Sequence, residues 1–222
     1  MTLAELIRRF RTMANDRVQP YFCSDEDVTD WLNDAQDQAC VRGRLLRDDS
    51  TPAVCRITLA AGQHTYPLHP KVYELISVRL KPANGDRPRD LRLVSREWLD
   101  AERPCWRDED RPACYAIQND TSLRIVGATA PGDELLLECY RLPMRALSLD
   151  TQRPEIHEAH HEHLIQWVLH KAYSVTDAEA FDANRAALAE AAFTRYFGLL
   201  PDSDMRRITR EDVPHHNVAI LP

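Results

Sequence analysis

The sequence HEAHH, which begins at His157, has the spacing of the zinc-protease motif H-E-x-x-H. In such sites two histidines one helical turn apart bind the metal, and the glutamate between them acts as the general base. His161 and Glu158 fill the second-ligand and base positions, and His160 and His163 bring four histidines into seven residues. The pattern therefore raises the hypothesis of a zinc-dependent hydrolase.

A third zinc ligand is missing from the positions where the known motifs place it. A catalytic zinc site keeps three protein ligands and one open position. The longer motif H-E-x-x-H-x-x-G-x-x-H needs glycine and histidine where this chain has Leu164 and Trp167. Glu179 is a candidate acidic ligand, but it stands three residues after Thr176, in the spacing of a helix-capping box that already explains it.

The apolar pattern around the motif predicts one helix over residues 154–174, with Pro154 in its first turn. At about 100° per residue, His157 and His161 fall in the same stripe as Leu164, while the other two histidines point elsewhere. Four histidines on one helix cannot converge on a single ion. We therefore predict that His157 and His161 pack against neighbouring helices, and that the chain has no metal site and no catalytic site.

The composition argues against other common classes of site. The six cysteines form no C-x-x-C pair and no secretion signal opens the chain, so we expect reduced thiols rather than a zinc ribbon. The formal net charge is −7 without a Lys/Arg block, which does not suit sequence-specific DNA binding. No glycine-rich phosphate loop is present, and no apolar run reaches the length of a membrane span. No cofactor and no membrane association are predicted.

Helices are expected at both ends of the chain, with strands between them. Thr2 and Glu5 form a capping box at the start of a helix over residues 2–17, and Ser24 is the predicted N-cap of a second helix. From about 53 to 143 the apolar period changes to two, which indicates strands. In that region Asn84-Gly85 indicates a hairpin, and a short helix is predicted with Ser95 as its cap.

The expected fold class is α+β. Two N-terminal and two C-terminal helices are predicted to form a four-helix bundle, into which an antiparallel β-sandwich or barrel is inserted. The last two helices, over 154–174 and 175–198, have a short connection and should form an antiparallel hairpin. The expected segments are 1–50 and 151–200 for the bundle, 51–150 for the β insertion and 201–222 for an extended tail.

Several segments, taken in order, resemble one known family. They are LIRRFRTMANDRVQPYFCSDEDVTDWLNDAQDQACVRGRLL, ITLAAGQHTYPLHPKVYELISVRL, ELLLECYRLP and PEIHEAHHEHLIQWVLHKAYSVTDAEAFD. Together they are similar to the head-to-tail adaptor proteins of tailed bacteriophages, which are also called connector or head-completion proteins. The resemblance covers nearly the whole chain, and it implies a helix bundle with a β insertion.

The resemblance also implies a structural role without catalysis. Such adaptors form a homo-oligomeric ring, commonly of twelve copies, beneath the portal protein in the neck of the virion. The ring extends the channel through which genome DNA passes without specific binding, and it offers a platform to tail or nozzle proteins. The chain would be made in the cytoplasm of the host bacterium. A zinc-dependent hydrolase, and a tail-completion or tail-tube protein elsewhere in the virion, remain the alternatives.

By the same resemblance, the C-terminal tail at 201–222 is expected to anchor the ring on the portal. Its apolar side chains would fill grooves on the partner, and its arginines would pair with partner acids. The expected portal-binding residues are Met205, Arg206, Arg207, Ile208, Arg210, Val213, Val218, Ile220 and Leu221. The loops at 81–90 and 102–113 are the expected contacts to tail components.

Overall fold

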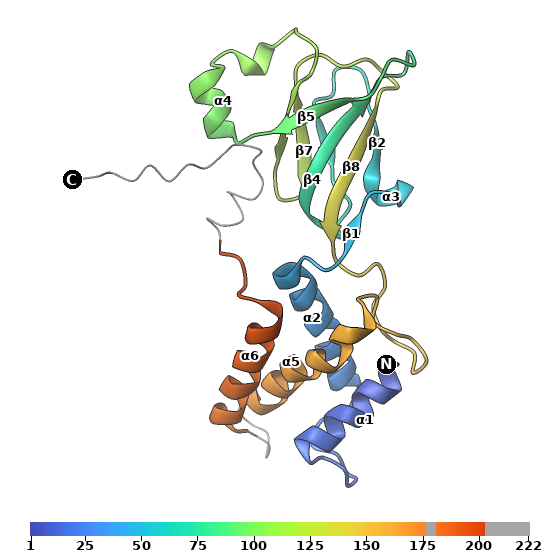
Figure 1. Ribbon diagram of the computed structural model, residues 1–222, viewed down its shortest axis with the longest axis vertical. Coiled ribbons are helices and arrows are strands. Elements are labelled where there is room, and N and C mark those ends of the chain that lie inside the picture. The colour runs from blue at the N-terminus through green and yellow to red at the C-terminus, as the bar shows by residue number, and fades with distance from the viewer. Residues whose placement is uncertain (176–180, 203–222) are drawn as a thin grey trace, which may run out of the picture. The chain divides into compact units, whose positions relative to one another are not determined.

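The computed structural model describes residues 1–175 and 181–202 of the chain (Figure 1). The fold is mixed α+β, which confirms the predicted class. The chain divides into two compact units. We call the first, Met1–Leu46 with Leu142–Leu200, the helical unit, and the second, Arg47–Arg141, the β unit. Within the described ranges, no helix is both long and apolar enough to cross a lipid bilayer.

Both N-terminal helices begin at the caps that the sequence predicts. Helix α1 (Leu3–Ala14) starts at Thr2, whose side chain accepts a hydrogen bond from the Glu5 main-chain nitrogen while the Glu5 side chain accepts one in return. Helix α2 (Asp25–Gly43) starts at Ser24 in the same way. Its C-cap, Arg44, has a left-handed backbone conformation, which is common where a helix ends.

The C-terminal helices begin later than predicted. Helix α5 (His161–Ser174) follows a single 3-10 turn, η2 (Glu158–His160), so the prediction of one helix over 154–174 was wrong in its first seven residues. The reason is local: His157 has an extended backbone, and its side chain accepts the Ala159 N–H and caps the short turn.

Helix α6 (Ala183–Phe197) is capped by Asp182, whose carboxylate accepts the main-chain N–H groups of Asn184 and Arg185. Residues 181 and 182 are not helical. Helix α6 therefore begins at Ala183, later than the predicted start at residue 175. The predicted capping box of Thr176 and Glu179 lies outside the described residues.

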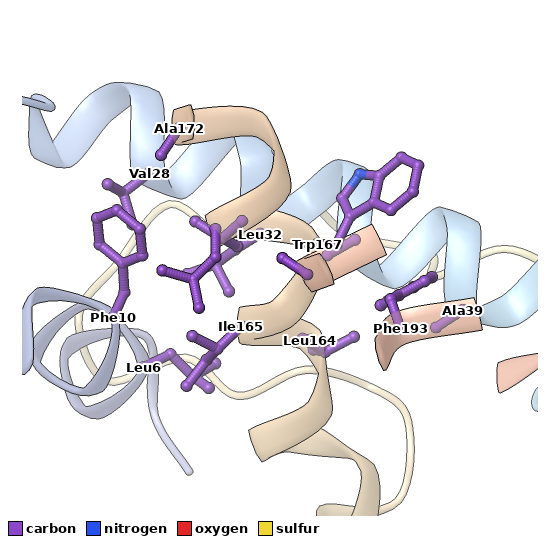
Figure 2. Packing of buried hydrophobic residues seen from close by; sticks show 14 of the residues in the cluster. Leu6, Phe10, Val28, Leu32, Ala39, Leu164, Ile165, Trp167, Ala172 and Phe193 are labelled. Carbon is purple, nitrogen blue, oxygen red and sulfur yellow. The ribbon is translucent and has the colours of Figure 1, made fainter. Parts of the chain in front are cut away.

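The four longest helices share one hydrophobic core, in which α5 packs against α1, α2 and α6 (Figure 2). Phe10 from α1, Leu32 from α2, Leu164 from α5 and Phe193 from α6 are completely buried. Each of these helices buries one apolar stripe, which is the arrangement that stabilises amphipathic helices in a bundle. The helical unit therefore depends on contributions from both ends of the chain.

The β unit is built on one curled sheet (Figure 1). Its strand order is β1-β8-β4-β5-β6-β7-β3, and β2 pairs with β8 beside β1. The strands are β1 (Arg47–Asp48), β2 (Arg56–Thr58), β3 (Thr65–Pro67), β4 (Val72–Lys81), β5 (Arg89–Leu93), β6 (Tyr115–Gln118), β7 (Ser122–Val126) and β8 (Glu134–Arg141). The short helices are α3 (Pro52–Cys55), α4 (Arg96–Glu102) and the 3-10 turn η1 (Trp106–Asp108).

One strand pair departs from the predicted antiparallel arrangement. Strands β5 and β6 run parallel, with Leu93 opposite Ala116. Parallel neighbours need a crossover connection, and α4 and η1 supply it here. The predicted cap of α4 is confirmed, because the Ser95 side chain accepts a hydrogen bond from the Trp98 N–H at 3.1 Å. The hairpin predicted at Asn84-Gly85 also joins antiparallel strands, β4 and β5.

A buried ion pair joins the strands by which the chain enters and leaves the β unit. Arg141 in β8 donates from Nε to Asp48 in β1 at 2.6 Å, and their side chains are 12% and 4% exposed. Burial alone would raise the pKa of Asp48, but hydrogen bonds from Thr51, Arg141 and Ser50 hold it well below its usual range. The two ends of the insertion are therefore fixed to each other.

Candidate interaction surfaces

Both ring nitrogens of His161 are engaged inside the helical unit. The Ile156 carbonyl oxygen lies 2.9 Å from Nε2, and because a carbonyl can only accept, Nε2 carries the hydrogen. Nδ1 then accepts from the α-amino group of Met1 at 2.8 Å. The ring is 2% exposed, and burial lowers its pKa. In this arrangement His161 has no lone pair to offer a metal ion.

The other histidines of the segment are less enclosed than His161, and His160 and His163 are half-buried. His157 is exposed and precedes the helix, so its predicted place in the apolar stripe was wrong, whereas the place of His161 is confirmed. Nδ1 of His160 lies 3.2 Å from the Tyr196 hydroxyl, and His163 stacks on the Tyr196 ring at 3.4 Å between centroids. Within the described part of the chain, no three His, Cys, Asp or Glu side chains form a group that could hold a metal.

Exposed large hydrophobic side chains are confined to the helical unit. All eleven that the described residues contain lie there, and nine of them fall in two short segments. We define the loop surface as Met13, Val18, Tyr21 and Phe22, and the α6 surface as Phe181, Leu188, Tyr196, Leu199 and Leu200. Exposed apolar side chains that gather in one region are candidates for contacts with other macromolecules.

The loop surface is held in shape by buried charges. Asp16 is 3% exposed, and it accepts hydrogen bonds from Arg11 and from the Phe22 main-chain N–H, the latter at 3.1 Å. Arg11 also donates to Asp25 at 2.6 Å, and its guanidinium lies 3.9 Å from the centroid of the Tyr21 ring. The loop between α1 and α2 is thus fixed from inside while Phe22 remains 57% exposed.

Within the α6 surface, Leu188 lies on the side of α6 that faces away from the core, whereas Tyr196 borders the buried face and stacks on His163 of α5. Ala186, Ala189, Phe193 and Phe197 are the buried residues of this helix. At the helical period, Leu188 falls on the opposite face, together with exposed alanines and Arg195. Leu188 is 72% exposed, so this face of α6 has no covering partner among the described residues.

A model of the SU10 adaptor protein family matches residues 1–215. The chain belongs to the SU10 adaptor protein family. This is a family of phage head-to-tail adaptors, so the resemblance noted in the sequence is confirmed, and it supports a structural adaptor role. No curated protein matches the chain significantly.

The loops that the sequence singles out lie in the β unit of the adaptor, and hydrogen bonds within that unit hold them. In the 81–90 loop, Asp133 accepts the Ala83 N–H at 3.0 Å. The 102–113 loop folds over Trp106, which is 4% exposed and donates from Nε1 to Asp100 at 2.8 Å. Among the described residues, neither loop has an exposed large hydrophobic side chain.

The portal-binding residues predicted in the adaptor, from Met205 to Leu221, lie outside the described residues. The two apolar surfaces were not predicted from the sequence. For the α6 surface a signal was available, because Leu188 falls outside the buried stripe of its own helix. For Phe22 the sequence carried no such signal, because an apolar residue in a loop is as consistent with a buried position as with an exposed one.

Proposed function

We propose that this adaptor is a non-enzymatic virion protein that assembles into a ring, commonly of twelve copies, beneath the portal. In this proposal α1, α2, α5 and α6 act as a four-helix bundle that supplies the contacts within the ring. The observation that carries the proposal is the restriction of exposed large hydrophobic side chains to the helical unit. Family membership gives this observation its context.

The charge of the chain suits a ring through which DNA moves. Affinity for nucleic acid comes mainly from Lys and Arg contacts with phosphates. The formal net charge of −7 therefore favours passage of the genome without specific binding. In the same proposal the chain is made in the bacterial cytoplasm and ends in the head-tail neck of the virion.

The remaining contacts are assigned to the two regions that the resemblance indicates. The tail at 201–222 anchors the ring on the portal through its apolar residues and arginines. The β-unit loops at 81–90 and 102–113 face tail or nozzle proteins. A short extended segment can cover a large surface on its partner.

Density for the neck region of the assembled particle is the direct test of this function. We expect the chain as a ring next to the portal, and native mass measurement of the chain mixed with the portal of the same phage should show a defined number of copies. A chain truncated after Asp202 should lose portal binding and keep its fold. Location in the tail tube, or a chain that stays monomeric with the portal present, would contradict the proposal.

A further inference from the structure

The loop surface follows α1, the α6 surface belongs to α6 and its flanks, and these two helices pack on either side of α5 (Figure 2). In Figure 1, α6 is at the left of this unit and α1, with the loop that follows it, is at the lower right. Helix α5 packs against both α1 and α6 and lies between them. Phe22 and Leu188 both remain exposed in a single copy, whereas a contact between two copies can cover both.

We propose that the loop surface of one copy packs against the α6 surface of the next copy, with Phe22 against Leu188. This inference rests on the proposed ring and names the contact that builds it. The two sides of such an interface differ, so the contact is heterologous, and each copy uses one surface on each neighbour. Contacts of this kind generate closed rings when the rotation between copies closes.

Charge next to the two surfaces is complementary. Arg195 lies seven residues after Leu188 on the outward face of α6, and it is exposed without a charged partner among the described residues. On α2, just after the loop surface, Glu26 and Asp30 stand one turn apart, exposed and likewise without an ion-pair partner in the described ranges. Opposite charges beside an apolar contact favour the correct partner and orientation.

Two local features of the surfaces also favour a contact between copies. Ala187 and Ala191, both small and exposed, lie beside Leu188 one turn apart, so a neighbouring chain can approach the backbone of α6 there. The loop opposite is fixed by the buried pair of Arg11 and Asp16. Because the loop is already fixed, few of its side chains lose conformational freedom on binding. A smaller entropy cost leaves a higher affinity for the same contacts.

Cysteine crosslinking tests the contact in the full chain. In a Cys105→Ser/Cys114→Ser background, which removes the exposed thiols, the Phe22→Cys/Leu188→Cys variant is treated with oxidised glutathione. Non-reducing electrophoresis should show a ladder of dimer, trimer and larger species that a reductant collapses. The matched control is Phe22→Cys/Leu149→Cys, because Leu149 is 61% exposed in the same unit but outside both surfaces, and it should give no ladder.

Each half of the interface can also be removed separately. Phe22→Asp and Leu188→Asp change exposed residues, so both chains should fold, and each alone should fail to form rings. Mixed together they should give a 1:1 dimer and nothing larger, since only one intact contact remains. Native mass spectrometry distinguishes this dimer from monomers and from rings.

Other results would overturn the inference. A single Phe22→Cys chain that crosslinks to itself would mean a symmetric contact, and a missing ladder would mean that another occupant covers Leu188. Rings that form normally from the Leu188→Asp chain would refute this interface and leave the proposed function intact. A wild-type chain that forms no ring, even on the portal, would instead refute the proposed function.

Discussion

Arg11 and Asp16 form an ion pair that is almost completely buried, with side-chain exposures of 7% and 3%. The pair connects the end of α1 to the loop that carries Phe22, because Asp16 also accepts the Phe22 main-chain N–H. Arg11 extends the connection to the start of α2 through Asp25. A charged network inside the protein thus determines the shape of a surface outside it.

Removal of Arg11 should destabilise the helical unit strongly. The Arg11→Met chain leaves Asp16 buried without its cation, and losing one partner of a buried pair costs about 3–5 kcal/mol. Urea unfolding followed by circular dichroism measures the change. The control is Arg9→Met, in the same helix, because the Arg9–Glu162 pair is about half exposed. Its loss should cost less than about 1 kcal/mol, and equal effects of the two substitutions would contradict this account.

The six thiols should react in an order set by their burial. Burial, followed by the nearby Asp48 carboxylate, raises the pKa of Cys55 to about 11, and burial with the adjacent Cys55 raises that of Cys139 to about 12. The thiolate is the reactive form, so both should resist alkylation at neutral pH. Cys105 and Cys114 are both exposed, but neighbouring groups partly desolvate the Cys114 sulfur and raise its pKa, so Cys105 should react first.

Iodoacetamide labelling with peptide mapping measures this order. The native chain should be modified at Cys105 and then Cys114, whereas all six cysteines should react after unfolding in guanidinium. Labelling of Cys55 in the folded chain as fast as that of Cys105 would show that the junction of α3 and β8 opens readily.

Two glycines of the β unit should respond differently to alanine. Gly85 and Gly127 both have positive φ angles, 86° and 104°, which strain any residue with a Cβ atom by about 1–2 kcal/mol. A Cβ atom at Gly85 would meet nothing within 4 Å, whereas at Gly127 it would lie 2.7 Å from both the Ala113 Cα and the Arg111 oxygen. Thermal unfolding should therefore show a larger loss for Gly127→Ala than for Gly85→Ala, by about 1–3 kcal/mol. Equal losses would mean that the backbone around Ala113 shifts easily.

Features of the fold that depend on near neighbours were predicted correctly from the sequence. The caps at Thr2, Ser24 and Ser95 each use hydrogen bonds within three residues, so their patterns are complete in the local sequence. The parallel pairing of β5 with β6 was not predicted, because it depends on where the crossover through α4 places the chain. Strand periodicity reports which face is buried and carries no information on direction.

Burial of individual residues was harder to predict than the elements themselves. Arginine is ordinarily a surface residue, and only the fold reveals that Arg11 is enclosed with Asp16. Similarly, Phe22 would be expected in the core, yet it is 57% exposed. Both candidate surfaces depend on side-chain exposure that only the tertiary structure determines. The sequence patterns therefore pointed to the loops at 81–90 and 102–113 and to the tail at 201–222 instead.

The zinc-like pattern illustrates the same point at His161. The His161 side chain belongs to the packing stripe, as predicted. The first histidine of the motif, His157, does not, because the chain turns there before α5 begins. His161 is therefore an enclosed neutral imidazole rather than a metal ligand. That environment has a consequence for the response of the adaptor to acid.

The helical unit should lose stability as the pH falls below about 6.5. Burial lowers the pKa of His161 in the folded chain below its ordinary value of 6.5, and burial with the neighbouring His157 and His163 lowers that of His160. Below that value the unfolded chain binds more protons than the folded one, so stability is present at higher pH and decreases with acidification.

Urea unfolding between about pH 7.5 and 5.5, above the range where most carboxylates titrate, measures this dependence. The His161→Gln chain should have a shallower pH dependence than the wild type, because its buried side chain has no proton to gain and the amide can still donate to the Ile156 carbonyl. His64→Gln controls for the loss of an exposed histidine in the β unit. A wild-type slope retained in the His161→Gln chain would mean that protonation of other groups sets the acid response of this adaptor.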